Sequence, residues 1–397
     1  MSPESLQAES VFFGFLLFFV TTILAGLLML YAGRPLLRRL ADWLFNRRGF
    51  EKLGRPLRVR PGNTPYENWL RTAKLDIPVH ECLYIEDVRT IPLEPWVQRG
   101  EGIRGLYLRL ADYQFTDGQI LEIPPGGATA TARHLFEMGI YFLGGPGHTM
   151  LLRPDLPPIR IDWRNRSVYS VPINALYQHF NDSEEPVRVL AISSFPFMMN
   201  SINSETFIFD NPIDLSERAR KKESPNSQAG RIGSNRECRD FVPDALKIEL
   251  KDHRIRGKGT RNMYWTMSGN SMIDINVSEM AGQTIKRAHR STSEATVLML
   301  SGEGYMVTWP EGAWHKRIRV NWREGTLIAQ PIFWYRQFMN PGSSTARNLT
   351  VSARSLVENL GLRFLDQMET DLPGITKAWE AELKAGPGGE KGKSCGP

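Results

Sequence analysis

Short apolar runs, separated by Gly, Pro or Asp, recur at close intervals from about residue 83 onwards. Regular spacing of such runs is typical of an antiparallel β-barrel or sandwich. No Gly-rich phosphate loop and no alternation of strands with helices is visible, which argues against nucleotide chemistry. The predicted strands of the first half are Leu83–Val88, Ile103–Leu110, Ile120–Ile123, Ile140–Leu143, Thr149–Leu152, Ile159–Trp163, Ser167–Val171 and Val187–Ile192.

The same order of elements occurs twice along the chain. Residues 121–147 read as a strand, a Pro-Gly turn, a His-x-x-Glu segment, a second strand and a Gly turn, and residues 275–304 repeat this order. A second related pair follows, VPINALYQHFN at 171–181 and QPIFWYRQFMN at 330–340. An internal repeat of this length predicts two copies of one β-domain.

The repeat sets the expected domain boundaries. The first domain is placed at 62–210 and the second at 263–355, joined by a polar linker at 211–262. The linker stretch is basic and lacks periodic apolar positions until Leu246–Leu250, so part of it is expected to be flexible. Residues 356–384 have helical periodicity broken at Pro373-Gly374, and the Gly/Lys-rich stretch 385–397 is expected to be a flexible tail.

The N-terminal pattern is of another kind. Val11–Ala32 carries no charged residue and would reach roughly 33 Å as a helix, enough to cross the hydrocarbon core of a bilayer. A cleaved signal peptide is the alternative, but it would have a basic start, and the residues before this run carry Glu4 and Glu9. We therefore expect an external N-terminus at 1–10, a transmembrane helix at 11–33 and a juxtamembrane segment at 34–61.

The charge after this run sets the expected orientation. Residues 34–60 contain nine Lys or Arg against Asp42 and Glu51. The positive-inside rule then places the chain in the inner (cytoplasmic) membrane as a single-pass protein, with the N-terminus outside and the β-domains in the cytoplasm. Leu and Trp positions of 35–48 share one helical face, which predicts an amphipathic helix at the lipid headgroups, with an ordinary packing helix as the alternative. The residues expected at the membrane interface are Arg34, Arg38, Arg39, Trp43, Arg47 and Arg48.

Composition changes this picture little. The chain has 397 residues, a net charge of +6, and cysteines only at Cys82, Cys238 and Cys395, which form no disulfide framework or zinc knuckle. A reducing compartment fits that usage. Anionic lipid accounts for the clustered juxtamembrane charge, and no nucleic-acid partner is expected.

Several motifs resemble those of a known family. Glu122-Ile-Pro-Pro-Gly126, Arg133-His134-Leu-Phe-Glu137 and Pro172-x-Asn174-x-x-Tyr177-Gln178-His179-Phe180-Asn181 are similar to the two motifs of the cupin superfamily, and in particular of gentisate-dioxygenase-like bicupins. The resemblance covers roughly residues 80–210 and 245–355. It implies an all-β fold of two cupin (jelly-roll β-barrel) domains behind one N-terminal transmembrane helix.

The resemblance also implies where a metal would bind. Cupins commonly hold Fe, Mn, Zn or Ni through a His-x-His pair and a Glu of the first motif and a His of the second. In the first barrel Ala132 stands at the first His position, while His134 and Glu137 are present and Tyr177 replaces the later His, with His179 two residues on. His134, Glu137 and His179 could form a two-His-one-carboxylate site for Fe or Mn, with Tyr177 as a fourth ligand.

The second barrel keeps fewer of these residues. His289 and Glu294 remain, but Ser291 replaces the second His and Arg336 stands at the later His position. A guanidinium is protonated and only donates hydrogen bonds, so it would repel a divalent cation. Arg336 is expected either to pair with Glu294 or to hold an anionic ligand. No metal is expected here.

Two functions of different classes follow from the resemblance. In the first, the protein is a non-catalytic bicupin without cofactor, an accessory or structural subunit of a membrane complex that binds the lipid bilayer and integral membrane subunits. In the second, the first barrel is a mononuclear Fe or Mn oxygenase or isomerase acting on an aromatic or small hydroxylated substrate. A small-ligand sensor is a third reading. The loss of ligands in both repeats favours the first.

Overall fold

The computed structural model describes residues 64–73, 77–153, 156–213, 235–368, 371 and 373–385. The expected transmembrane helix, the juxtamembrane segment with its interface residues, and most of the expected tail lie outside these residues. Within the described ranges, no helix combines the length and the apolar character that crossing a bilayer requires.

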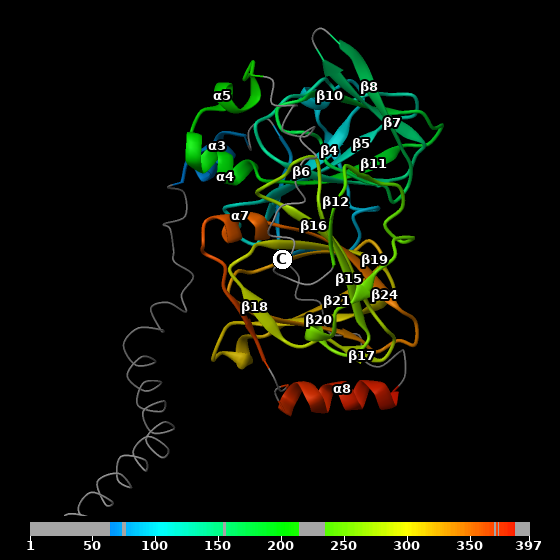
Figure 1. The fold of residues 1–397 in the computed structure, drawn as a ribbon, viewed down its shortest axis with the longest axis vertical. Helices are drawn as coiled ribbons and strands as arrows, with labels where there is room; N and C mark the ends of the chain where they lie inside the picture. Colours follow the sequence, from blue (N-terminus) through cyan, green and yellow to red (C-terminus); the bar gives the residue numbers. More distant parts are fainter. Residues whose placement is uncertain are drawn as a thin grey trace, which may run out of the picture. The chain divides into compact units, whose positions relative to one another are not determined.

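The first half of the chain folds into a β-barrel, as its spaced apolar runs predicted (Figure 1). Its larger sheet has the order β1-β4-β5-β11-β6-β9-β13, with β3 beside β4, and its smaller sheet has the order β10-β7-β8. The strands of the larger sheet are β1 Val79–Cys82, β3 Glu94–Pro95, β4 Arg104–Leu110, β5 Asp117–Ile123, β6 Met138–Leu143, β9 Val168–Tyr169, β11 Val187–Ser193 and β13 Phe241–Val242. Those of the smaller sheet are β7 Gly147–Arg153, β8 Leu156–Trp163 and β10 Leu176–Asn181.

The second half repeats this design. One sheet has the order β12-β15-β16-β24-β19-β22-β2, with β14 beside β15, and the other has the order β21-β20-β23-β18-β25, with β17 beside β23. The first of these sheets is built from β2 Tyr84–Ile85, β12 Arg236–Cys238, β14 Lys251–Asp252, β15 Thr260–Thr266, β16 Asp274–Met280, β19 Ala295–Ser301, β22 Leu327–Gln330 and β24 Ala346–Ser352. The second is built from β17 Thr284–Ile285, β18 His289–Ser291, β20 Glu303–Trp309, β21 Ile318–Arg323, β23 Tyr335–Asn340 and β25 Leu365–Gln367.

The two barrels exchange short strands. Strand β2, which follows β1 of the first barrel in sequence, pairs with β22 of the second, and β13, which follows β12 of the second barrel, pairs with β9 of the first. The expected linker at 211–262 is therefore not a linker throughout, because its described part from residue 235 contributes strands to both barrels. Val242, Ala245 and Leu250 of this stretch are buried in the main core.

That core lies between the barrels. It combines Leu108, Ile120 and Leu190 of the first barrel with Trp265, Ile275, Leu298 and other residues of the second, so the barrels form one compact unit. The interface is close-packed at Gly139 on β6, where an added Cβ would lie 2.8 Å from the Ile275 side chain. A bulkier residue there would force the sheets apart.

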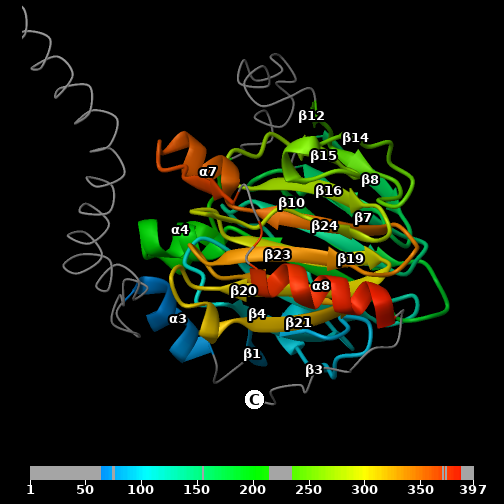
Figure 2. The same cartoon turned by 90° about the horizontal axis from the view of Figure 1, so that it is seen from below.

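Short helices cover the outside of the barrels. The α-helices are α3 Pro65–Ala73, α4 Phe195–Ile202, α5 Glu205–Phe209, α7 Arg354–Asn359 and α8 Pro373–Ala385, and the 3₁₀-helices are η1 Val97–Arg99, η2 Arg254–Arg256 and η3 Trp314–Lys316. Pro373-Gly374, expected to break a helix, instead begins α8, which agrees with the preference of Pro for the first helical turn. Figure 2 shows α8 across the sheet of β20 and β23, where Ile375 and Trp379 are buried.

Candidate functional site

Glu137, the carboxylate of the first cupin-like motif, binds the other barrel. The backbone N–H groups of Ser271, Met272 and Ile273, in the loop between β15 and β16, donate to it at 2.7, 2.7 and 3.0 Å. The carboxylate satisfies three N–H groups that would otherwise be buried without a partner. It therefore does not join His134 and His179 in a shared ligand set.

Glu294, its counterpart in the second barrel, binds the first barrel in the same way. The N–H groups of Gln114, Phe115 and Thr116, between β4 and β5, donate to it at 2.7, 3.0 and 2.7 Å, and the Thr116 hydroxyl donates at 3.0 Å. Burial raises the pKa of Glu294 to about 7, although these donors oppose the shift. The expected pairing of Glu294 with Arg336 is therefore wrong, because the carboxylate is turned to the other barrel.

Three other expected site residues do meet inside the first barrel. His134 Nδ1 donates to the Phe136 carbonyl at 2.8 Å, and this leaves Nε2 to accept from the Tyr177 hydroxyl at 3.1 Å. The ring of His179 lies 5.1 Å from that of Tyr177, since residues two apart on β10 face the same side. Burial lowers the pKa of His134 and of His179 to about 3, so both imidazoles are neutral at pH 7.

The His179 ring has a hydrogen-bond partner at its Nδ1 atom. Thr149 Oγ1 lies 2.7 Å from its Nδ1 and accepts from Trp163 Nε1 at 3.1 Å. The threonine hydroxyl proton is then available to Nδ1, and the neutral ring carries its own proton on Nε2. Both imidazoles thus have their lone pairs engaged by hydroxyl groups.

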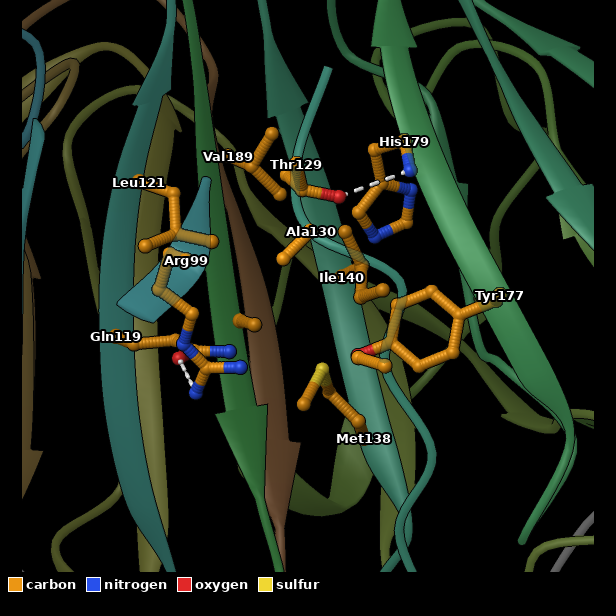
Figure 3. A pocket seen from close by; sticks show the side chains of 12 residues that line it. Arg99, Gln119, Leu121, Thr129, Ala130, Met138, Ile140, Tyr177, His179 and Val189 are labelled. Atoms are coloured by element: carbon orange, nitrogen blue, oxygen red, sulfur yellow. Dashed lines mark hydrogen bonds between the residues drawn. The ribbon is translucent and has the colours of Figure 1, made fainter. Parts of the chain in front are cut away.

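A small cavity lies beside these rings, and a cation lies next to it. Figure 3 shows the Arg99 guanidinium, the Tyr177 hydroxyl and the His179 ring around the same space. The cavity has a volume of about 20 Å³. That is room for water or a very small molecule and not for an aromatic substrate. Arg99 donates to Gln119 at 2.7 Å and lies 5.0 Å from the Trp96 ring centre.

A buried carboxyl lies on the same strand as Gln119. Asp117 accepts from Ser193 Oγ at 2.5 Å and from the Tyr107 hydroxyl, which in turn lies 3.1 Å from the Tyr66 hydroxyl. Burial raises the pKa of Asp117 to about 7. Both of these partners are hydroxyl groups that can donate or accept, so the network accommodates a neutral carboxyl.

Iron or manganese, which the resemblance implied, does not fit this set of donors. A mononuclear site for either metal uses neutral imidazoles together with a carboxylate. Here Glu137 is bound to the other barrel, the imidazole lone pairs are engaged, and the Arg99 charge acts on both histidines. The described part of the chain has no group of three or more His, Cys, Asp or Glu arranged to hold a metal ion.

In the second barrel, His289 and Arg336 lie opposite each other on β18 and β23. Arg336 Nη2 donates to Ser291 Oγ at 3.1 Å, and Nη1 is buried without a hydrogen-bond partner.

The membrane-interface residues fall outside the described part of the chain and stay an expectation.

Four buried or half-buried residues were not predicted from the sequence: Arg99, Asp117 and their second-barrel counterparts Arg256 and Asp274. The sequence does contain a signal for them. Arg99 and Arg256 are 157 positions apart, as are Asp117 and Asp274, and this is the separation of Glu137 and Glu294. Aligning the two copies residue by residue would have shown an arginine before a glycine and an aspartate at a strand start in both.

No protein-family model and no curated protein sequence matches this chain. Among solved structures, it is similar to the salicylate 1,2-dioxygenase of Pseudoaminobacter salicylatoxidans in its adducts with gentisate. The two are 13% identical, with a TM-score of 0.51 over 85% of this chain and 95% of that one. A deletion variant of the Bacillus subtilis oxalate decarboxylase is 13% identical, with a TM-score of 0.46 over 69% of this chain and 77% of that one. The likeness to the dioxygenase shows the fold, two jelly-roll barrels in tandem.

Proposed function

We propose that this protein is a membrane-anchored, non-catalytic bicupin that serves as an accessory or structural subunit on the cytoplasmic face of a membrane complex. The observation that carries the proposal is the use of Glu137 and Glu294. Each is the carboxylate of a cupin-like motif, and each is bound to backbone N–H groups of the other barrel. A carboxylate committed in this way holds the barrels together and is not free to bind a catalytic metal.

The contents of the barrels support the same proposal. The first holds neutral hydrogen-bonded rings and Arg99, with space for little more than water. The second holds Arg336 at a position where the cupin resemblance implies a ligand. Catalysis at a metal needs an open coordination position and room for substrate. The chain therefore keeps the barrel scaffold but not the catalysis at a metal.

The anchor is the part of the proposal that comes from sequence. The uncharged run Val11–Ala32 and the basic stretch behind it support a single span with the barrels on the cytoplasmic side. A subunit held this way would lie against the cytoplasmic surface of its partners, with small residues of the span such as Gly14, Ala25 and Gly26 available for close helix contacts.

Purification from gently solubilised membranes tests the proposal. We expect the tagged full chain to bring down a fixed set of integral membrane proteins in constant ratio. A matched variant with residues 11–33 exchanged for an unrelated apolar span should anchor the barrels but lose or weaken that set. A chain that purifies alone, and that turns over a small aromatic or hydroxylated acid with bound iron or manganese, would overturn the proposal in favour of an oxygenase or isomerase.

A further inference from the structure

The interior of the second barrel gathers basic side chains from four places in the fold. Arg256 ends η2, Lys286 precedes β18, His289 begins β18, and Arg336 lies on β23 directly opposite His289. Backbone hydrogen bonds tie these places together: Arg287 N–H donates to the Arg256 carbonyl at 2.8 Å, and Lys286 N–H donates to the Phe338 carbonyl at 2.9 Å. The cluster is therefore fixed by the barrel itself and not by flexible loops.

Arg336 is the least satisfied member of this cluster. Its side chain is only 6% exposed. One nitrogen, Nη2, donates to the neutral Ser291 hydroxyl, while Nη1 is buried with no hydrogen-bond partner. Burying a guanidinium nitrogen without an acceptor costs free energy, and a charged group costs more than a neutral one. An acceptor that carries negative charge would remove that cost.

Lys286 is also buried beside neutral partners. It is 8% exposed, donates to Ser278 Oγ at 2.9 Å, and lies 6.0 Å from the Phe338 ring centre. A hydroxyl and an aromatic face are neutral partners, so neither cancels the ammonium charge. Arg256 is also held by a neutral group, the Gln367 side-chain oxygen at 3.0 Å.

Two buried carboxylates of this barrel form their hydrogen bonds and ion pairs with other groups, although the charge of Glu279 also acts on Lys286. Glu279 pairs with Arg347 at 2.6 Å and with Arg261 at 3.5 Å, and Glu294 binds the first barrel. As a result, the positively charged side chains of the cluster repel one another. Burial, and then the charge of Arg256, lower the pKa of Lys286 to about 8 and that of Arg336 to about 10.

The first barrel provides an internal comparison. The positions equivalent to Lys286, His289 and Arg336 are Thr129, Ala132 and Tyr177, all uncharged. Arg256 does have a basic counterpart in the first barrel, Arg99, so the two barrels differ in Lys286, His289 and Arg336, which the second barrel adds to the shared arginine.

We propose that the second barrel binds a small oxyanion, a carboxylate or a phosphate, between Arg336, Lys286 and Arg256. Arg336 Nη1 supplies the buried donor, Lys286 supplies a point charge, and Arg256, which is partly exposed, supplies a second guanidinium. A guanidinium fork matches the two oxygens of either anion. This site does not depend on the accessory role proposed above, since an enzyme or a subunit could carry it.

Binding to the purified full chain tests the site, with inorganic phosphate and malonate as probes and potassium chloride added to hold the ionic strength constant. We expect saturable binding of at least one of the two at one site per chain, measured by titration calorimetry, and a melting temperature that rises with its concentration. Preference for phosphate or for malonate assigns the class of oxyanion, and either supports the site. Arg336→Met and Lys286→Gln should each weaken binding at least tenfold, as expected for loss of a charge-assisted hydrogen bond.

The matched control is Arg254→Gln. Arg254 lies in the same short helix as Arg256 but its side chain is 85% exposed and pairs with Asp252 at 3.4 Å. The Arg254→Gln substitution removes one positive charge, as Lys286→Gln does, but removes it from the surface. Its affinity for the probe should stay within about twofold of that of the natural chain, as expected for a surface charge screened by solvent and salt. Absence of saturable binding of both probes, or an equal loss in Arg254→Gln and Lys286→Gln, would overturn the proposal. Lys286→Gln retains a donor for Ser278 and gives the answer even where Arg336→Met does not fold.

Discussion

Glu137 and Glu294 occupy equivalent positions in the two barrels, and each accepts hydrogen bonds from the backbone of the barrel to which it does not belong. The relationship is reciprocal, since residues 271–273 bind Glu137 and residues 114–116 bind Glu294. The exchange of β2 and β13 between the barrels follows the same two-fold pattern. The motif carboxylates thus act as a pair of clamps between domains.

Removing one clamp should destabilise the protein strongly. Glu137→Ala leaves the N–H groups of Ser271, Met272 and Ile273 without their acceptor, and a buried donor left unsatisfied typically costs about 1–3 kcal/mol. Urea unfolding followed by tryptophan fluorescence measures this. Glu101→Ala, in an exposed turn, is the control and should change stability by no more than about 0.5 kcal/mol. A Glu137→Ala protein as stable as the control would show that the clamp contributes nothing.

The buried carboxyl of Asp117 makes a pH-dependent prediction. Its pKa is raised to about 7 in the folded chain, against about 3.9 for an aspartate in the unfolded chain. Between these values the folded state holds a proton that the unfolded state has lost, so stability falls as pH rises, by about 1.4 kcal/mol per unit. Asp117→Asn removes this dependence, and both Ser193 and Tyr107 can bond to an amide.

The test compares the two proteins across pH 4–8. The stability of Asp117→Asn minus that of the natural chain should rise with pH and level off near pH 7. The neutral His134 and His179 contribute the opposite slope, but they are present in both proteins and cancel in the difference. A difference that is flat across this range would mean that Asp117 is ionised in the folded protein.

Two equivalent glycines make a prediction about packing. An added Cβ at Gly147 would meet the Trp163 indole and the Phe180 carbonyl, and one at Gly304 would meet the Trp322 indole and the Met339 carbonyl. Gly147→Ala and Gly304→Ala should each cost about 1–3 kcal/mol by overpacking. Gly342→Ala is the control, because its Cβ would have only one neighbour within 4 Å, at 3.4 Å. Equal melting temperatures for all three variants would contradict the packing described here.

The fold could be predicted from the sequence because its signals are local and repeated. Spaced apolar runs gave the strands of the first barrel, and β4, β5, β6, β7, β8 and β11 lie where those runs predicted them. Trp163 and Trp322, at equivalent positions of the two barrels, are both buried. Strand β2 lies within the predicted strand Leu83–Val88, but its pairing with the second barrel was not predicted, and β13 was missed. Two residues carry too little pattern to say which sheet they join.

The site could be predicted only in part. His134, Tyr177 and His179 meet inside the first barrel, as the alternation of β10 and the motif spacing implied. Glu137 does not meet them, because a carboxylate at a motif position can turn inwards or bind a neighbouring loop, and only the tertiary contact with residues 271–273 decides between these. The pattern of one barrel contains no information about the loop of the other.

The expected orientation in the membrane is tested in intact cells. Protease added from outside should leave the barrels intact, because the basic stretch after Ala32 keeps them in the cytoplasm. The same protease added to opened cells should cleave the basic stretch that joins the barrels to the span. Loss of the barrels in intact cells would reverse the proposed orientation.

The metal content of the full chain tests the central claim most directly. After growth with ample iron and manganese and purification without chelator or added metal, elemental analysis should find both metals well below one atom per chain. His134→Ala and His179→Ala should leave that value unchanged. Near-stoichiometric iron or manganese that is lost in both variants would contradict the account, since it would mean that the first barrel holds a metal centre.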